Sequence, residues 1–181
     1  MKYLLFTGMA FSFVLYSSIA LAGGPGLNGT WKFVPGKSTD IASWGNSLPQ
    51  IEISSSDANV RVISEWLERG KIAFADTFDV HTGGGAVTST VRSEVWPPNW
   101  FMGVLSVPGE PRTVSGSWLE PGKSLRVVSR ETLRTSQGKI PVTTTFDYTL
   151  EADGKTMTCS EKRSTRPSPV VLVFERKEAA P

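Results

Sequence analysis

Short segments rich in turn-forming residues interrupt the chain at close intervals from residue 29 onward, and they constrain the fold more than any other feature. They combine glycine, which readily adopts positive φ, with proline, asparagine, aspartate and serine. The breaks lie at residues 56–59, 68–70, 82–85, 97–99, 108–109, 121–122, 137–138, 153–154 and 167–169. Because no window between them shows a 3.6-residue apolar stripe, this spacing predicts successive strands joined by turns.

The segments between the breaks are rich in valine, threonine and aromatic residues that alternate with polar ones, as half-buried strands do. We expect strands at residues 60–67, 71–80, 86–95, 112–119, 124–133, 140–150, 156–164 and 170–176. Since the connections are short and hairpin-like, the sequence predicts an all-β fold with little helix. Its antiparallel up-and-down meander would close into a barrel of about 8–10 strands. The alternative is a two-sheet sandwich with a crossover at residues 35–49.

The N-terminus has the pattern of a secretory signal. Lys2 is followed by an apolar run from Tyr3 to Leu15, and the small residues of Ala20-Leu21-Ala22 follow before Gly23. This order predicts a signal peptide over residues 1–22 and export to the periplasm or the medium. Residues 23–181 would then form one barrel domain with no transmembrane span. A retained membrane anchor is the alternative, although the apolar run is short for a span of about 20 residues.

Residues 27–38, LNGTWKFVPGKS, resemble the opening of the lipocalin and fatty-acid-binding-protein superfamily, the calycins. In that superfamily a Gly-x-Trp motif begins the first strand and its tryptophan closes one end of the barrel. Here the motif falls on Gly29 and Trp31. The segment VVLVFERKE, residues 170–178, resembles the closing strand of fatty-acid-binding proteins. Arg176 matches the arginine that packs over the motif tryptophan in lipocalins. The resemblance, which is nearest to uncharacterised lipocalin-like domains of exported bacterial proteins, implies structural roles for all three residues.

Fatty-acid-binding proteins insert a pair of helices after the first strand as a lid, and this chain departs from that pattern. Its corresponding segment, residues 35–49, contains prolines at both ends, two glycines and three serines. It has room for one short helical turn around residues 40–44. We therefore expect the lid to be absent or supplied by another segment.

The segment EVWPPNWFMGVLSVPG, residues 94–109, carries much apolar surface for a loop. Its paired prolines cannot donate hydrogen bonds to a sheet, so they hold the loop out of strand pairing. Three interpretations remain open. Trp100, Phe101 and Met102 could fold back and fill the barrel core, as large aromatic residues usually do. Trp96, Trp100 and Phe101 could instead cover a ligand at the barrel mouth, or form a patch that contacts a partner or a membrane.

Two carboxylates interrupt the apolar faces of expected strands. Asp76 shares its face with Phe74 and Phe78, and Glu131 lies on the face of Leu133. With a strict period of two, both acids point inward. A buried carboxylate needs a partner or changes its pKa, so inward acids would indicate an ion pair or a wet, polar-lined cavity. A single β-bulge would reverse this and place both acids in solvent.

The face that begins with Met157 and Cys159 continues into Glu161 and Arg163. One interpretation turns these charges inward, with Arg163 as a partner for Asp76 or Glu131. The other is that the end of the strand leaves the core. An acidic lining would suit a neutral or amine-bearing ligand with an apolar body, because a free fatty acid would need an inward arginine.

The sequence offers little for catalysis or for a cofactor. The one histidine, His81, opens a glycine-rich turn, and no Gly-x-Ser-x-Gly nucleophile turn is present. We predict no catalytic residues, no metal site and no cofactor. The formal net charge of +2 comes from mixed signs, which argues against nucleic-acid binding.

The preferred interpretation is therefore an exported, non-catalytic, lipocalin-like protein that binds a small apolar or amphiphilic molecule. The expected ligand contacts are Phe74, Asp76, Phe78, Trp96, Trp100, Phe101 and Glu131. The alternative is a filled barrel that contacts a protein or an envelope surface through the Trp96–Trp100 loop. An enzyme that uses Asp76, Glu131 or tyrosines is the third candidate, and the sequence identifies no protein partner.

Overall fold

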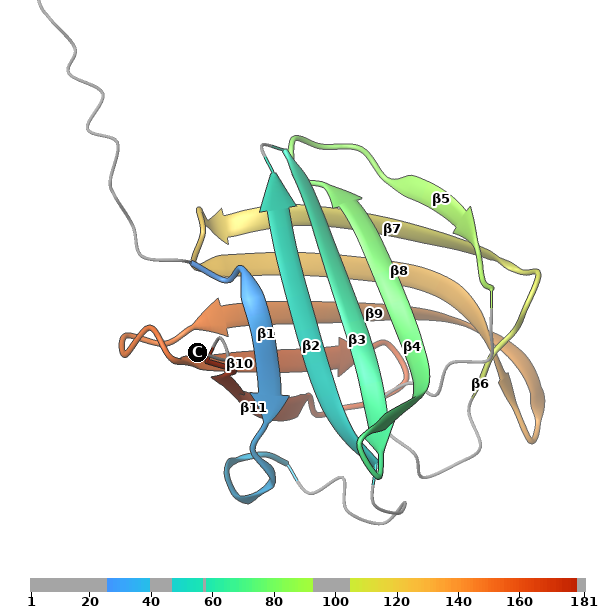
Figure 1. Ribbon diagram of the computed structural model, residues 1–181. Coiled ribbons are helices and arrows are strands. Elements are labelled where there is room, and N and C mark those ends of the chain that lie inside the picture. Colours follow the sequence, from blue (N-terminus) through green and yellow to red (C-terminus); the bar gives the residue numbers. More distant parts are fainter. Residues whose placement is uncertain (1–25, 40–46, 57, 93–104, 179–181) are drawn as a thin grey trace, which may run out of the picture.

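The chain folds as one antiparallel sheet that curls into a nearly closed barrel (Figure 1). The computed structural model describes residues 26–39, 47–56, 58–92 and 105–178. The strands are β1 (Gly29–Phe33), β2 (Ser47–Ser56), β3 (Asn59–Glu68), β4 (Lys71–His81), β5 (Val87–Thr90), β6 (Leu105–Ser106), β7 (Pro111–Glu120), β8 (Ser124–Thr135), β9 (Gly138–Leu150), β10 (Thr156–Arg163) and β11 (Val170–Arg176). A single turn of 3-10 helix, η1 (Pro35–Lys37), follows β1. The predicted all-β barrel with little helix is confirmed.

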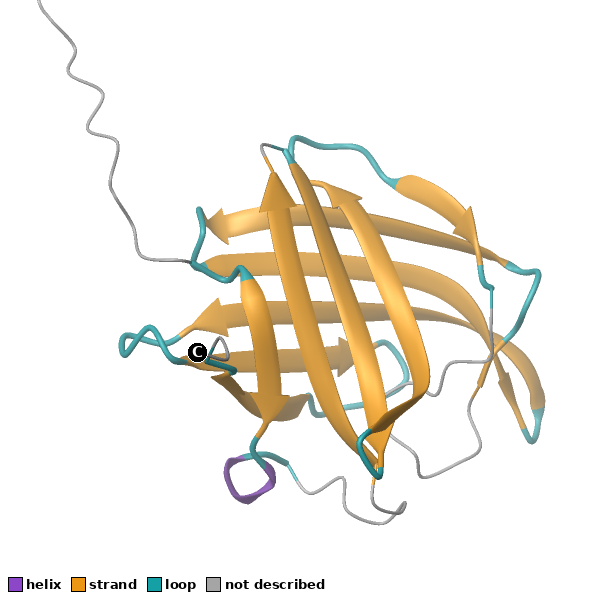
Figure 2. Ribbon diagram, in the orientation of Figure 1, coloured by secondary structure: helices purple, strands orange, loops and turns teal. Residues whose placement is uncertain are grey.

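Neighbouring strands follow the order β4-β3-β2-β1-β11-β10-β9-β8-β7-β5, and β6 pairs separately with β8. Strands β1–β4 cross in front of β7–β10 at a steep angle, which gives a flattened barrel (Figure 2). The first and last strands of the chain, β1 and β11, pair with each other, and Trp31 lies opposite Arg176 and Phe33 opposite Phe174. The two ends of the described chain therefore meet at one end of the barrel.

The barrel departs from full closure at one place, which we call the seam. It lies between β4 and the β5–β7 pair, the two ends of the strand order. Near one end of the seam, Val80 of β4 packs against β7 at Gly116, where an added Cβ would lie 2.8 Å from Val80 Cγ2. Glycine thus lets β4 and β7 approach each other without a ladder of hydrogen bonds.

Strand β2 was not among the predicted strands. Its interior contains Pro49, which cannot donate to a ladder. The pairing of β1 with β2 covers only Gln50 to Ile53, so Pro49 has a strand neighbour on one side alone, at Trp66 of β3. A proline is tolerated in such a position. The helical turn expected at residues 40–44 lies outside the described residues.

One β-bulge does occur on β4, but it leaves the predicted facing of Asp76 intact. The register with β3 shifts between Trp66 and Leu67, so Trp66 pairs with Phe74 and Leu67 with Ile72. Ile72 is consequently turned outward and is 57% exposed. Beyond the bulge the alternation resumes, and it carries Asp76 and Phe78 to the interior.

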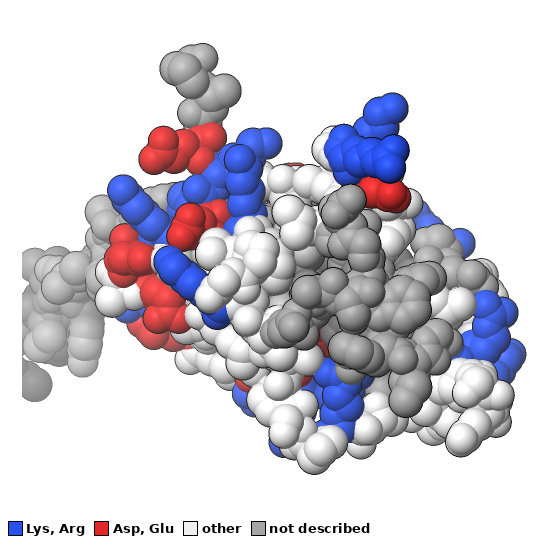
Figure 3. Space-filling model, turned by 90° about the horizontal axis from the view of Figure 1, so that it is seen from below, with Lys and Arg blue, Asp and Glu red and all other residues white. Residues whose placement is uncertain are grey.

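The outer surface carries charges of both signs. The face seen from below in Figure 3 shows lysine and arginine intermixed with aspartate and glutamate on its left side, and uncharged side chains make up much of the described surface next to them. No long basic stripe of the kind that follows a nucleic-acid backbone is visible on this face. Among the described residues, no helix has the length and apolar character needed to cross a membrane.

Candidate functional site

The interior of the barrel is lined by apolar side chains and by an unusual number of charged ones. Period-two alternation along four strands brings these charges inward, because alternate residues share a face. Asp76 comes from β4, Arg112 from β7, Glu131 from β8, and Glu161 and Arg163 from β10. The polar-lined interior that strict alternation predicted is therefore present.

Asp76 and Arg112 form an ion pair across the seam. Arg112 donates to the two carboxylate oxygens of Asp76 at 2.7 and 2.8 Å, and also to the carbonyl of Thr77 at 3.1 Å. The two charged side chains are only 7% and 18% exposed, and the guanidinium lies 4.9 Å from the ring centre of Phe78. This bidentate pair links β4 to β7 where no strand ladder does.

Glu131 faces the same interior but makes a different contact. Its carboxylate accepts a hydrogen bond of 2.9 Å from the hydroxyl of Ser106 on β6. Burial raises the pKa of Glu131 above its ordinary value, while the bond from Ser106 and the charge of Arg112 partly oppose the rise. Glu131 therefore holds a proton at a higher pH in the folded protein than in the unfolded chain.

Glu131→Gln should change how stability depends on pH. Between the ordinary pKa of 4.5 and the raised pKa, the folded protein keeps a proton that the unfolded chain releases, so stability falls as pH rises. Glutamine resembles the protonated acid, and the variant should be more stable than the wild type above this window. Urea midpoints from about pH 4 to about pH 8 measure the difference. The exposed Glu52→Gln substitution controls for the loss of one carboxylate. Parallel profiles for wild type and Glu131→Gln would contradict the assignment.

Glu161 and Arg163 form a second ion pair, which is fully inside the barrel. Arg163 Nε donates to Glu161 Oε1 at 2.7 Å, and the side chains are 4% and 0% exposed. The interpretation in which the end of this strand leaves the core is therefore wrong, because β10 continues its alternation to its last residue. Arg163 is paired with Glu161 and not with Asp76 or Glu131. Burial raises the pKa of Glu161, while the charges of Arg163 and Arg166 oppose the rise.

Several buried polar atoms of these groups have no hydrogen-bond partner among the described residues. They include Glu161 Oε2 and Arg163 Nη2 in one pair and Arg112 Nε in the other. An unmade hydrogen bond in a low-dielectric interior costs about 1–3 kcal/mol, and more for a charged group. Such atoms are rare in native cores, and they can indicate a bound molecule or a functional role.

Aromatic rings form the apolar wall beside these charges. Phe78 lies 5.3 Å from Phe146, and Trp66 stacks on Phe74 at 4.8 Å between ring centres. The rings of Trp66, Phe78 and Phe146 line an interior cavity of about 50 Å³, together with Asp76 and the Glu161–Arg163 pair. That volume is enough for a few water molecules but well below the volume of a typical ligand pocket.

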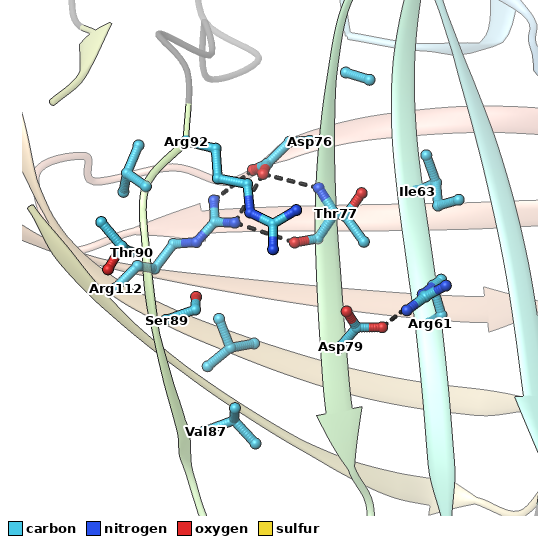
Figure 4. Close-up of a pocket in the computed structure, with 13 residues that line it drawn as sticks. Arg61, Ile63, Asp76, Thr77, Asp79, Val87, Ser89, Thr90, Arg92 and Arg112 are labelled. Carbon is cyan, nitrogen blue, oxygen red and sulfur yellow. Dashed lines mark hydrogen bonds and ion pairs between the residues drawn. The ribbon is translucent and has the colours of Figure 1, made fainter. Parts of the chain in front are cut away.

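A much larger groove, of about 520 Å³, follows the seam on the outside (Figure 4). One wall comes from β3 and β4 and the other from β5 and the residues after it. Asp76 lines both the groove and the interior cavity, so the Asp76–Arg112 pair separates the two spaces. Any molecule that passed from the groove into the barrel at this point would have to move this pair.

The closed end of the barrel is built around Trp31, which is completely buried. Its indole N–H donates to the carbonyl of Leu27 at 2.9 Å, and the guanidinium of Arg176 lies 4.2 Å above the ring. Gly29 has φ +132°, and an added Cβ would lie 2.9 Å from Arg176 Nη1. The Gly-x-Trp motif thus needs glycine both for its backbone conformation and for the approach of the arginine.

The structure brings four of the predicted ligand contacts to the interior side, Phe74, Asp76, Phe78 and Glu131. Trp96, Trp100 and Phe101 lie outside the described residues, so the three interpretations of their loop stay predictions. Sequence reasoning missed Arg112, although it shares a face with the apolar Val114 and the same alternation would have turned it inward. The statement that a carboxylate ligand would find no inward arginine is wrong, since Arg112 and Arg163 are both buried.

Neither a family model nor a curated protein matches the sequence. Solved structures of similar shape are found. A structure titled "REP1-NXSQ fatty acid transporter" aligns with TM-score 0.50 and 9% identity, over 85% of this chain and 98% of that one. A fatty acid binding protein of Schistosoma mansoni in complex with arachidonic acid aligns with TM-score 0.50 and 13% identity, over 84% and 96%. The chain thus has the calycin-type barrel fold that its two ends predicted.

Proposed function

We propose that this protein is an exported, non-catalytic carrier or receptor that binds a small amphiphilic molecule in and beside its barrel. The observation that carries the proposal is the composition of the interior, where aromatic rings face buried ion pairs whose hydrogen bonds are incomplete. Apolar side chains in this space would often make the barrel more stable, because the attraction within a buried ion pair often does not exceed the cost of removing both charges from water.

The two spaces at the seam suggest how such a molecule would be held. The interior cavity of about 50 Å³ accepts little, whereas the groove of about 520 Å³ falls within the usual range for a ligand site. The apolar part of the ligand would contact Phe78 and Phe146 after the Asp76–Arg112 pair shifts. Its polar part would stay beside the charges. The two structural neighbours, titled a fatty acid transporter and a fatty acid binding protein, support an apolar ligand, although no fatty acid is specified by this geometry.

The test uses N-phenyl-1-naphthylamine, an uncharged probe whose fluorescence rises in apolar surroundings. The wild type should bind it saturably, and Phe146→Ala should weaken binding about tenfold because an aromatic contact in the lining is lost. Phe33→Ala is the matched control. Phe33 is also partly buried, but its ring packs on Phe174 and it does not line the cavity. No saturable response from the wild type, or equal losses in both variants, would contradict the proposal.

A further inference from the structure

We infer that the seam groove contains a binding site for a single anionic group, centred on Arg92. The site deepens the proposed function, on which it rests for the apolar part of the ligand, by naming the class of molecule bound. That class is an amphiphile with a carboxylate, sulfonate or phosphate head.

Two of the three arginines that line the groove already form ion pairs with acidic side chains. Arg61 donates to Asp79 at 2.6 Å, and Arg112 holds Asp76 with two bonds. These two pairs neutralise both acids of the groove wall. Arg92 is exposed, and it forms no ion pair or hydrogen bond with any residue that the structure describes. Among the described residues of the lining, one positive charge therefore remains, and it is free to bind an anion.

The position of Arg92 suits it to receive a ligand. Figure 4 shows its side chain extending from the segment after β5 across the groove toward Asp76 and Thr77 on β4. The hydroxyl-bearing residues Ser89 and Thr90 line the same wall and add possible donors. A guanidinium presents several N–H groups in one plane and binds planar or tetrahedral oxyanions through two of them at once. One anionic head is therefore the complement of this wall.

The groove and the interior share Asp76, which fixes how such a ligand would lie. If Arg92 bound the head group, the apolar part of the ligand would lie at the Asp76–Arg112 pair, next to the ring of Phe78. An uncharged ligand of the same shape would gain only the apolar contacts. Between two molecules of similar apolar body, the protein should therefore bind the anionic one more tightly.

The test compares two probes that share the anilinonaphthalene body. 1-Anilinonaphthalene-8-sulfonate carries the anionic group, and N-phenyl-1-naphthylamine lacks it. Arg92→Gln should weaken sulfonate binding about tenfold and make it less sensitive to salt, because one charge-assisted contact is lost. Binding of the uncharged probe should stay the same. Arg130→Gln removes an equal charge from the exposed outer side of β8 and should leave both affinities unchanged.

The outcomes separate this inference from the proposed function. Equal sulfonate affinity in wild type and Arg92→Gln, or no sulfonate binding at all, would overturn the anion site. If the uncharged probe fails to bind while the sulfonate binds in an Arg92-dependent way, the anion site stands and the proposed interior site fails. A similar loss in Arg130→Gln would show that net charge, not the groove, attracts the sulfonate, and it would also overturn the inference.

Discussion

Replacing Arg163 by methionine is expected to lower the free energy of unfolding by about 3–5 kcal/mol, because it leaves Glu161 buried without its partner. Both side chains of this pair are almost completely buried, so bulk solvent does not reach the carboxylate that loses its partner. A domain of ordinary stability, about 5–15 kcal/mol, would lose a large fraction of it. Urea unfolding followed by circular dichroism measures the change. The loss should be smaller at acidic pH, where Glu161 becomes neutral.

Two further variants make this first prediction specific. The double substitution Glu161→Leu and Arg163→Met removes both charges and should recover most of the lost stability, since apolar replacements of buried pairs are often neutral or better. Arg61→Met breaks the exposed pair with Asp79 and should cost less than about 1 kcal/mol. If the buried and exposed single variants lose equal stability, the pair does not contribute as described.

Trp31→Ala is expected to cost about 3–5 kcal/mol by opening a cavity at the closed end of the barrel. The substitution removes a completely buried ring, its hydrogen bond to Leu27 and the surface on which Arg176 lies. Urea unfolding should be followed by circular dichroism, because the variant lacks one tryptophan signal. Trp118→Ala is the matched control, since Trp118 is only partly buried at the edge of the core. Comparable losses in the two variants would contradict a special role for the closed end.

Much of the fold was predictable because turn chemistry is local. The glycine and proline breaks fixed the limits of β3, β4 and β7–β11 to within a few residues. Strand β2 was not predicted, because its proline is tolerated only where a strand neighbour is missing. Whether a neighbour is missing depends on the sheet order and not on the segment itself. The location of the seam is likewise a property of the closed sheet, so no window of the sequence reveals it.

Alternation along the strands predicted which charged side chains of the candidate site point inward, but not which of them form ion pairs with each other. Alternation alone turned Asp76 inward, and the bulge near Ile72 falls before it and does not disturb it. The partner of Asp76 comes from β7, which reaches β4 only because the barrel curls round. Arg163 was correctly placed on the face of Met157, but proximity along the strand gave it Glu161 as a partner. Pairing is decided by three-dimensional neighbours that a period of two cannot specify.

The seam has a consequence for how the barrel can change its width. Within the described residues, β4 and the β5–β7 pair are held together by side chains, chiefly the Asp76–Arg112 pair and the contact of Val80 with Gly116. Separating them at this line would enlarge the circumference and leave every backbone ladder intact. The barrel can therefore increase its interior volume by breaking a few side-chain contacts across the seam, without any local unfolding.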